Sequence, residues 1–145
     1  MKRMHIHVSV ADLDNSIRFY STLFGQQPTR TELDYAKWQL ENPRVNFAIS
    51  NRENTPGLNH LGIQVENDDE LVEMHERLAQ LSAPSIEEKD AQCCYAQSDK
   101  YWTQDPNGLM WETFHTLGTV PVFGSSKKDA ACCVPDPAKT SGCCT

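Results

Sequence analysis

Apolar and polar positions alternate near the start of the chain, and the same alternation returns further along. It runs from Met4 to Val10 and again from Leu58 to Val65, which is the period of a half-buried strand. After each stretch, apolar residues recur at helical spacing: Leu13, Ile17, Tyr20 and Phe24, then Leu71, Met74, Leu78 and Leu81. The pattern therefore predicts a strand followed by an amphipathic helix, twice.

Capping and breaking residues mark the ends of both predicted helices. Asp12 or Asp14 can cap the first helix, and Gly25 is a natural stop. The acidic run from Asn67 to Glu70 caps and charges the start of the second helix, and Pro84 breaks it. Two separate helices are expected.

Further strands and turns follow each helix. After the first helix, Pro28 begins irregular or edge structure, and strands are predicted from Asp34 to Leu40 and from Arg44 to Ile49. After the second helix come short strands, and then a last strand from Leu109 to Phe114 that follows the turn Asp105 to Gly108. Both halves thus contain the same kinds of element in the same order.

This order indicates an internal duplication of strand, helix, strand, strand and strand. The segment HIHVSV from His5 superposes on HLGIQV from His60. A second match pairs Asn42-Pro43 before one strand with Asp105-Pro106 before another. The sequence therefore predicts an α+β fold built from two βαβββ modules.

The duplication also sets the expected domain organisation. One module would span residues 1–52 and the other residues 53–117, and their mixed sheet would enclose a cup. Residues 118–145 have the polar, Gly- and Pro-containing composition of a flexible, disordered tail.

Composition and charge narrow the functional classes. The 145 residues are 39% hydrophobic, which suffices for a core, and the net charge of −7 would repel a nucleic-acid backbone. No segment has the pattern of a signal peptide or the length of an apolar membrane span. We therefore expect a cytoplasmic protein with reduced thiols and with neither nucleic-acid nor membrane partners.

All six cysteines stand in adjacent pairs: Cys93–Cys94, Cys132–Cys133 and Cys143–Cys144. Adjacent cysteines bond to each other poorly, because closing that ring strains the intervening peptide. Two neighbouring thiolates can instead converge on one soft atom. The pattern predicts binding of a metalloid or soft metal, and the two pairs in the tail would either pass the bound atom on or scavenge it.

Repeat equivalence points to a second, metal-binding feature. His5 and His60 occupy the same place in the two modules, whereas His7, which shares the strand face of His5 and competes with it, matches Gly62. Glu112 lies in an apolar terminal strand and would need a partner if buried. Two imidazoles and one carboxylate with open coordination positions suit non-haem Fe(II), with zinc as an alternative.

These motifs resemble the vicinal oxygen chelate superfamily of paired βαβββ modules. The resemblance covers roughly residues 1–116 and rests on HIHVSVADLDNSIRFYSTLFG, LNHLGIQV and DPNGLMWE. Within that superfamily, the stretches CCYA and DKYW and the tail with paired cysteines resemble the ArsI-type C–As lyases, which include CadI-type proteins.

The resemblance implies an Fe(II)-dependent dioxygenase that uses O2 to cleave the carbon–arsenic bond of small trivalent organoarsenicals such as methylarsenite, releasing arsenite. It assigns His5, His60 and Glu112 to the metal and to catalysis, and Cys93 and Cys94 to the arsenical. Family members vary at the position of His5, so His7 remains an alternative ligand.

Two other functions fit the same sequence. One is a non-catalytic protein that sequesters a metalloid or cadmium, which the cysteine-rich tail favours. The other is a thiol-transferring resistance enzyme of the same superfamily, which would leave Cys93 and Cys94 without a purpose. Methyl and aromatic arsenicals both fit the sequence, as do a monomer and a homodimer, with the modules pairing within one chain or swapping between two.

Overall fold

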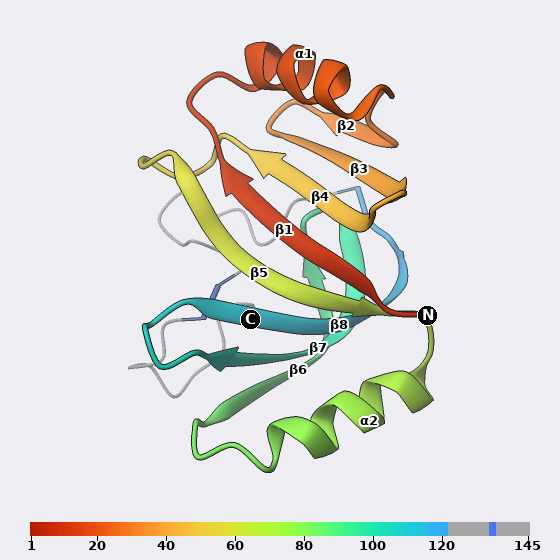
Figure 1. Cartoon of the computed structure of the whole chain (residues 1–145), viewed down its shortest axis with the longest axis vertical. Helices are drawn as coiled ribbons and strands as arrows, with labels where there is room; N and C mark the ends of the chain where they lie inside the picture. The colour runs from red at the N-terminus through yellow and green to blue at the C-terminus, as the bar shows by residue number, and fades with distance from the viewer. Residues whose placement is uncertain (122–133, 136–145) are drawn as a thin grey trace. The chain divides into compact units, whose positions relative to one another are not determined.

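The computed structural model describes residues 1–121 and 134–135, and it confirms the α+β class with two βαβββ modules (Figure 1). The first module contains β1 (Arg3–Ser9), α1 (Leu13–Phe24), β2 (Arg30–Glu32), β3 (Tyr35–Glu41) and β4 (Arg44–Ser50). The second contains β5 (Gly57–Val65), α2 (Asp68–Leu78), β6 (Ser85–Cys93), β7 (Ala96–Gln104) and β8 (Met110–Thr119). The tail cysteines Cys132, Cys133, Cys143 and Cys144 lie outside the described residues.

By Cα proximity the chain divides into two compact units. The first unit is Arg3–Leu61, and the second combines Met1–Lys2 with the chain from Gly62 onward. Strand β5 runs from the first unit into the second. In the part of the chain that the structure describes, no helix has the length and apolar character needed to cross a membrane.

In the first unit, the strands lie in the order β2-β3-β4-β1, followed by β5. Strand β1 is parallel to β4, and the other two pairs, β2–β3 and β3–β4, are antiparallel, so the sheet is mixed. Helix α1 packs on one face of it (Figure 1). The buried residues of that core are Val10, Leu13, Ala36, Trp38, Leu40, Phe47 and Ile49.

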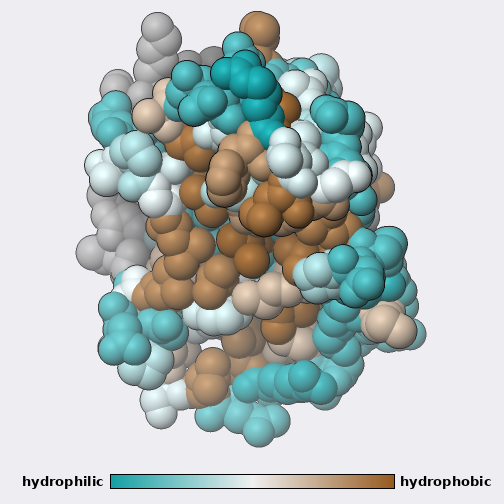
Figure 2. Space-filling view, turned by 45° about the horizontal axis from the view of Figure 1, so that its top comes forward, coloured by the Kyte–Doolittle hydropathy of each residue, from teal (hydrophilic) through white to brown (hydrophobic). Residues whose placement is uncertain are grey.

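Helix α1 begins and ends where its sequence predicts. The side chain of Asp12 accepts a hydrogen bond from the backbone N–H of Asn15 at 2.9 Å, so Asp12 is the N-cap and Asp14 lies in the first turn. Gly25 ends the helix with a φ of 68°, in the left-handed region that favours glycine. The helix is not wholly covered: Phe19 is 61% exposed, and apolar side chains reach the surface on the face drawn in Figure 2.

Strand β1 buries its polar side chains more deeply than its apolar ones. Ile6 and Val8 pack against the α1 core but remain partly exposed. The opposite face of the strand carries four buried polar residues: Arg3, His5, His7 and Ser9. Because burying polar groups is unfavourable unless they have partners, this inverted pattern marks a functional face of the sheet.

In the second unit, β6, β7 and β8 form consecutive antiparallel pairs, and α2 packs against β7 and β8. The apolar cluster under α2 contains Val65, Leu71 and Met74, with Ile63 and Tyr101 packed against them. The side chain of Asn67 accepts from the N–H of Glu70 at 2.9 Å and caps the helix. The predicted start of α2 is therefore confirmed.

The end of α2 differs from the prediction. The helix ends at Leu78, and Leu81, which was expected on its apolar stripe, is 52% exposed. The N–H of Leu81 bonds to the carbonyl of Leu78 and that of Gln80 to Arg77, so the chain tightens into three-residue turns before Pro84 can act as the breaker.

The strands of the second unit are longer than predicted. Strand β8 continues past Phe114 to Thr119, where it pairs with Ala96 at the start of β7. Strands β6 and β7 each have 9 residues rather than being short. Mutual pairing extends all three strands beyond the segments that their apolar patterns indicate.

The register of the duplication is visible in the pairing of the strands. In the first unit, His7 is the partner of Ala48 across β1 and β4. In the second unit, a Cβ placed on Gly62 would lie 2.4 Å from the backbone oxygen of Glu112. His7 therefore matches Gly62, as the sequence repeat predicts, and Ala48 matches Glu112.

The close approach at Gly62 gives a test of this register. Replacement of Gly62 by alanine forces β5 and β8 apart, so we expect a loss of about 1–3 kcal/mol in the free energy of unfolding. Gly118→Ala is the matched control, because a Cβ there meets nothing within 4 Å. Urea denaturation measures both, and equal midpoints for the two variants would show that the strands are not in this register.

Candidate metal and thiol sites

Three histidines of the first unit gather on the polar face of its sheet. His5 and His7 come from β1 and His60 from β5, and their exposed fractions are 6%, 3% and 1%. One ring nitrogen from each lies within 4.8 Å of the others. The predicted pairing of His5 with His60 is present, and His7 belongs to the same cluster.

The hydrogen bonds of His5 and His60 set the protonation of their rings. Nδ1 of His5 lies 3.1 Å from the carbonyl oxygen of Asn46, which can only accept, so Nδ1 carries the proton. Nδ1 of His60 lies 2.6 Å from Oδ1 of Asn59. The amide nitrogen of Asn59 donates to Glu53 at 2.5 Å, which leaves its oxygen to accept from His60.

In the neutral rings, both Nε2 atoms therefore present lone pairs. These two atoms face each other at 3.2 Å in a buried setting, where both can bind the same cation. Two nitrogens bound at 2.0–2.1 Å to one tetrahedral ion are about 3.4 Å apart, and at a right angle about 2.9 Å. The separation of His5 and His60 falls inside that interval, so the pair fits a divalent metal.

The surrounding residues hold the rings in that orientation. Metal-bound imidazoles usually donate their second N–H to a carbonyl or carboxylate, which fixes the tautomer. Asn46 and Asn59 supply such acceptors to His5 and His60, and Oγ of Ser50 lies 2.9 Å from Nε2 of His7. The first unit thus brings the candidate ligands and their hydrogen-bond partners together.

Glu112 is buried on β8 in the second unit, and it has the partner that burial requires. Nζ of Lys100 donates to Oε1 of Glu112 at 2.6 Å, and both side chains are buried. An exposed edge position for Glu112 is thereby excluded. Burial alone lowers the pKa of Lys100, but the charges of Glu112, Cys94 and Glu88 and the hydrogen bond to Glu112 outweigh it, so the pKa is raised above its usual value.

Cys93 and Cys94 lie at the tight turn between β6 and β7. Cys93 pairs with Ala96, which leaves Cys94 and Tyr95 as a two-residue loop with φ values of 55° and 61°. Left-handed backbone at both positions is the geometry of a type I′ hairpin, which normally uses Asn or Gly. Cysteine and tyrosine hold it only with strain, and such strain clusters at functional sites.

The two sulfur atoms of this turn are 3.1 Å apart. Cys93 is buried and Cys94 is half-buried. The turn therefore places two cysteine side chains next to each other, one of them partly open to solvent.

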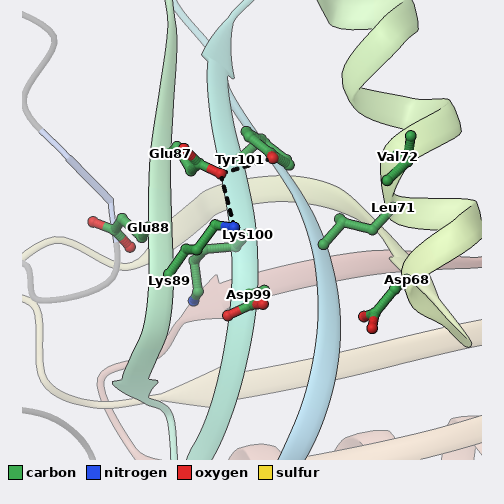
Figure 3. Close-up of a pocket in the computed structure, with 9 residues that line it drawn as sticks. All are labelled: Asp68, Leu71, Val72, Glu87, Glu88, Lys89, Asp99, Lys100 and Tyr101. Carbon is green, nitrogen blue, oxygen red and sulfur yellow. Dashed lines mark hydrogen bonds and ion pairs between the residues drawn. The ribbon is translucent and has the colours of Figure 1, made fainter.

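A separate cavity of about 250 Å³ lies beside α2 in the second unit (Figure 3). Its wall combines apolar side chains of α2 with charged side chains of β6 and β7. Glu87 accepts from the hydroxyl of Tyr101 at 2.9 Å and lies 3.7 Å from Lys89. Burial, Glu87 and Asp99 together raise the pKa of Tyr101 to about 12. None of the residues predicted for metal or arsenic lines this cavity.

The family model for the Glyoxalase/Bleomycin resistance protein/Dioxygenase superfamily matches residues 2–113. The chain belongs to this superfamily. Within it, a curated relative from Bacillus sp. (strain MD1), named trivalent organoarsenical cleaving enzyme, is 41% identical over 149 residues, with 100% of this chain and 91% of the relative covered. Cadmium-induced protein CadI of Mycobacterium tuberculosis is 31% identical, with 88% of this chain and 85% of the relative covered. The predicted resemblance is confirmed.

Solved structures of the superfamily show the same fold. An extradiol ring-cleaving dioxygenase from B. fuscum aligns with a TM-score of 0.62 at 17% identity, covering 81% of this chain and 33% of that chain. At this identity the likeness supports the fold.

Several hydrogen-bond partners of the predicted site residues were not foreseen from the sequence. Asn46 and Ser50 were not predicted; they lie on the neighbouring strand β4, opposite His5 and Ser9. Lys100 was also missed as a partner of Glu112. Its signal is weak, because a lysine in a strand is ordinarily an exposed edge residue.

The buried ion pair gives a prediction on stability. Lys100→Met leaves the Glu112 carboxylate buried without its ammonium partner, which should lower the free energy of unfolding by about 3–5 kcal/mol. Lys89→Met is the control, because that side chain is 70% exposed and should change stability little. Thermal or urea unfolding distinguishes them, and equal stability of the two variants would contradict the pairing.

Proposed function

We propose that this protein is an Fe(II)-dependent enzyme that cleaves the carbon–arsenic bond of trivalent organoarsenicals, with O2 as the second substrate and arsenite as the product. The observation that carries the proposal is the pair of sulfur atoms of Cys93 and Cys94, 3.1 Å apart on a strained turn. The similarity to trivalent organoarsenical cleaving enzymes along the whole chain supports the same substrate class.

The spacing of the thiols suits one soft atom. Two sulfurs bound at about 2.3 Å to one atom, at nearly a right angle, are about 3.3 Å apart. Trivalent arsenic is thiophilic, and methylarsenite carries two exchangeable oxygen substituents. Reduced Cys93 and Cys94 would displace both oxygens and release water, which leaves the methyl group as the third substituent and fixes its direction.

The proposed metal ligands are His5, His60 and Glu112. Support for the imidazoles comes from their facing Nε2 atoms, and support for the carboxylate comes from its burial and its place in the repeat. Two imidazoles and one carboxylate are the set used by non-haem Fe(II), while zinc is the alternative metal. Bound Fe(II) would supply the activation of O2, for which no side chain of the chain suffices.

The residues around these ligands have distinct tasks. Asn46 and Asn59 keep the imidazole Nε2 atoms unprotonated and aimed at each other. Lys100 keeps Glu112 ionised, because a buried ammonium beside a carboxylate stabilises the charged form. The turn at Cys94 fixes the direction in which the bound arsenical projects its carbon.

Atom balance defines the products of the reaction. One CH3As(OH)2 and one O2 contain the atoms of one As(OH)3 and one formaldehyde. Arsenic stays trivalent, so the carbon is oxidised and O2 is reduced. The reaction should therefore consume O2, release arsenite and release formaldehyde in equal amounts.

We further propose that the protein acts in the cytoplasm on a small molecule, as a monomer or a homodimer. Chelation of the arsenical needs both cysteines as thiols, and the cytoplasm keeps thiols reduced. Sequestration of arsenic or cadmium without turnover is the alternative, favoured by the similarity to cadmium-induced CadI.

The order of binding and chemistry can be tested in one experiment. Reduced protein with Fe(II) is loaded anaerobically with methylarsenite, freed of unbound ligand and then exposed to O2. We expect the arsenical to remain bound without O2, and arsenite to appear only after O2 is admitted. Arsenite release without O2 would contradict the dioxygenase reaction, and permanent retention of the arsenical after O2 would favour sequestration.

Variants of the turn test the part played by the thiols. Cys93→Ser or Cys94→Ser leaves one thiolate, so we expect loss of retained arsenical and at least a tenfold fall in turnover, with Fe(II) still bound. The matched control is Cys143→Ser/Cys144→Ser, which removes two adjacent thiols elsewhere and should retain turnover. Full turnover in both single variants would remove these cysteines from the site.

A further inference from the structure

We propose that His7 is a third imidazole ligand of the proposed metal, so that the first unit contributes His5, His7 and His60 to it. This inference rests on metal binding as part of the proposed function, but not on an arsenical being the substrate. It extends the pair of imidazoles that the repeat predicts.

The position of His7 is the first argument. Its ring centroid lies 5.0 Å from that of His60 and 6.4 Å from that of His5, and its side chain is buried. The ring nitrogens of all three residues lie within 4.8 Å, at most about 1.4 Å beyond the spacing of ligands around one ion. A modest rotation of one side chain closes that difference.

The duplication supplies the second argument, which is independent of the first. In the second unit, the small residue Gly62 lies against Glu112 across β5 and β8. In the first unit the arrangement is reversed. The larger residue, His7, lies on β1, and it pairs with the small residue Ala48 on β4. The methyl group of Ala48 leaves space beside His7 that a longer side chain would fill. Each module thus places one donor beside one small residue.

The chemistry of the cluster indicates the class of ion. Three imidazoles are neutral nitrogen donors of intermediate softness, which suit Fe(II), Co(II) and zinc rather than Mg²⁺ or Ca²⁺. Ser50 can donate to His7 or accept from it, so its hydroxyl orients that ring in either tautomer. The third imidazole should therefore raise affinity and narrow metal preference.

The test uses Co(II) and full-length protein that has been stripped of metal. Each imidazole bound to Co(II) gives one exchangeable N–H proton resonance shifted far outside the ordinary proton spectrum. We expect three such resonances in the unaltered protein and two in His7→Ala, with a dissociation constant raised at least tenfold. Ser50→Ala should retain three resonances, and His75→Ala, whose ring stacks on Tyr101 in the second unit, is the control.

Each outcome decides the inference. Two resonances in the unaltered protein, or equal affinity in the unaltered and His7→Ala proteins, would overturn it. The count in the unaltered protein decides alone if His7→Ala does not fold. Absence of Co(II) binding would overturn both this inference and the proposed metal chemistry. Three resonances together with failure to cleave an arsenical would support the ligand and contradict the proposed function.

Discussion

The two facing Nε2 atoms of His5 and His60 are the constraint on which the first unit depends. Nδ1 of each ring lies against an oxygen of Asn46 or Asn59, so the Nε2 atoms face each other across 3.2 Å inside the protein. A metal ion between the two atoms would bind both imidazoles at once. One face of the sheet packs against α1, and its other face carries the buried polar side chains.

In the second unit, a buried acidic side chain is paired with a buried basic one. Burial of Glu112 is compensated by Lys100, and the ammonium in turn experiences the charge of Cys94. The strained turn at Cys94 and Tyr95 is maintained by the long antiparallel pairing of β6 with β7. Rigid strands thus carry both the carboxylate and the thiols, which limits the reorganisation that substrate binding would require.

Sequence predicted the elements and the imidazoles well, for identifiable physical reasons. Periodicity and capping located both helices, and the repeat register paired His5 with His60. The sequence did not reveal that α2 ends at Leu78 or that β8 continues to Thr119, because turns and strand pairing determine where these elements end. It also missed Lys100 as the buried partner of Glu112, since only tertiary structure brings the two side chains together.

Anomalous diffraction from crystals of the metal-loaded protein tests the central claim most directly. Data collected on both sides of the metal absorption edge would locate the ion without reference to activity. The account predicts one strong peak within bonding distance of Nε2 of His5 and Nε2 of His60. A peak only at surface carboxylates, with nothing beside these two nitrogens, would contradict it.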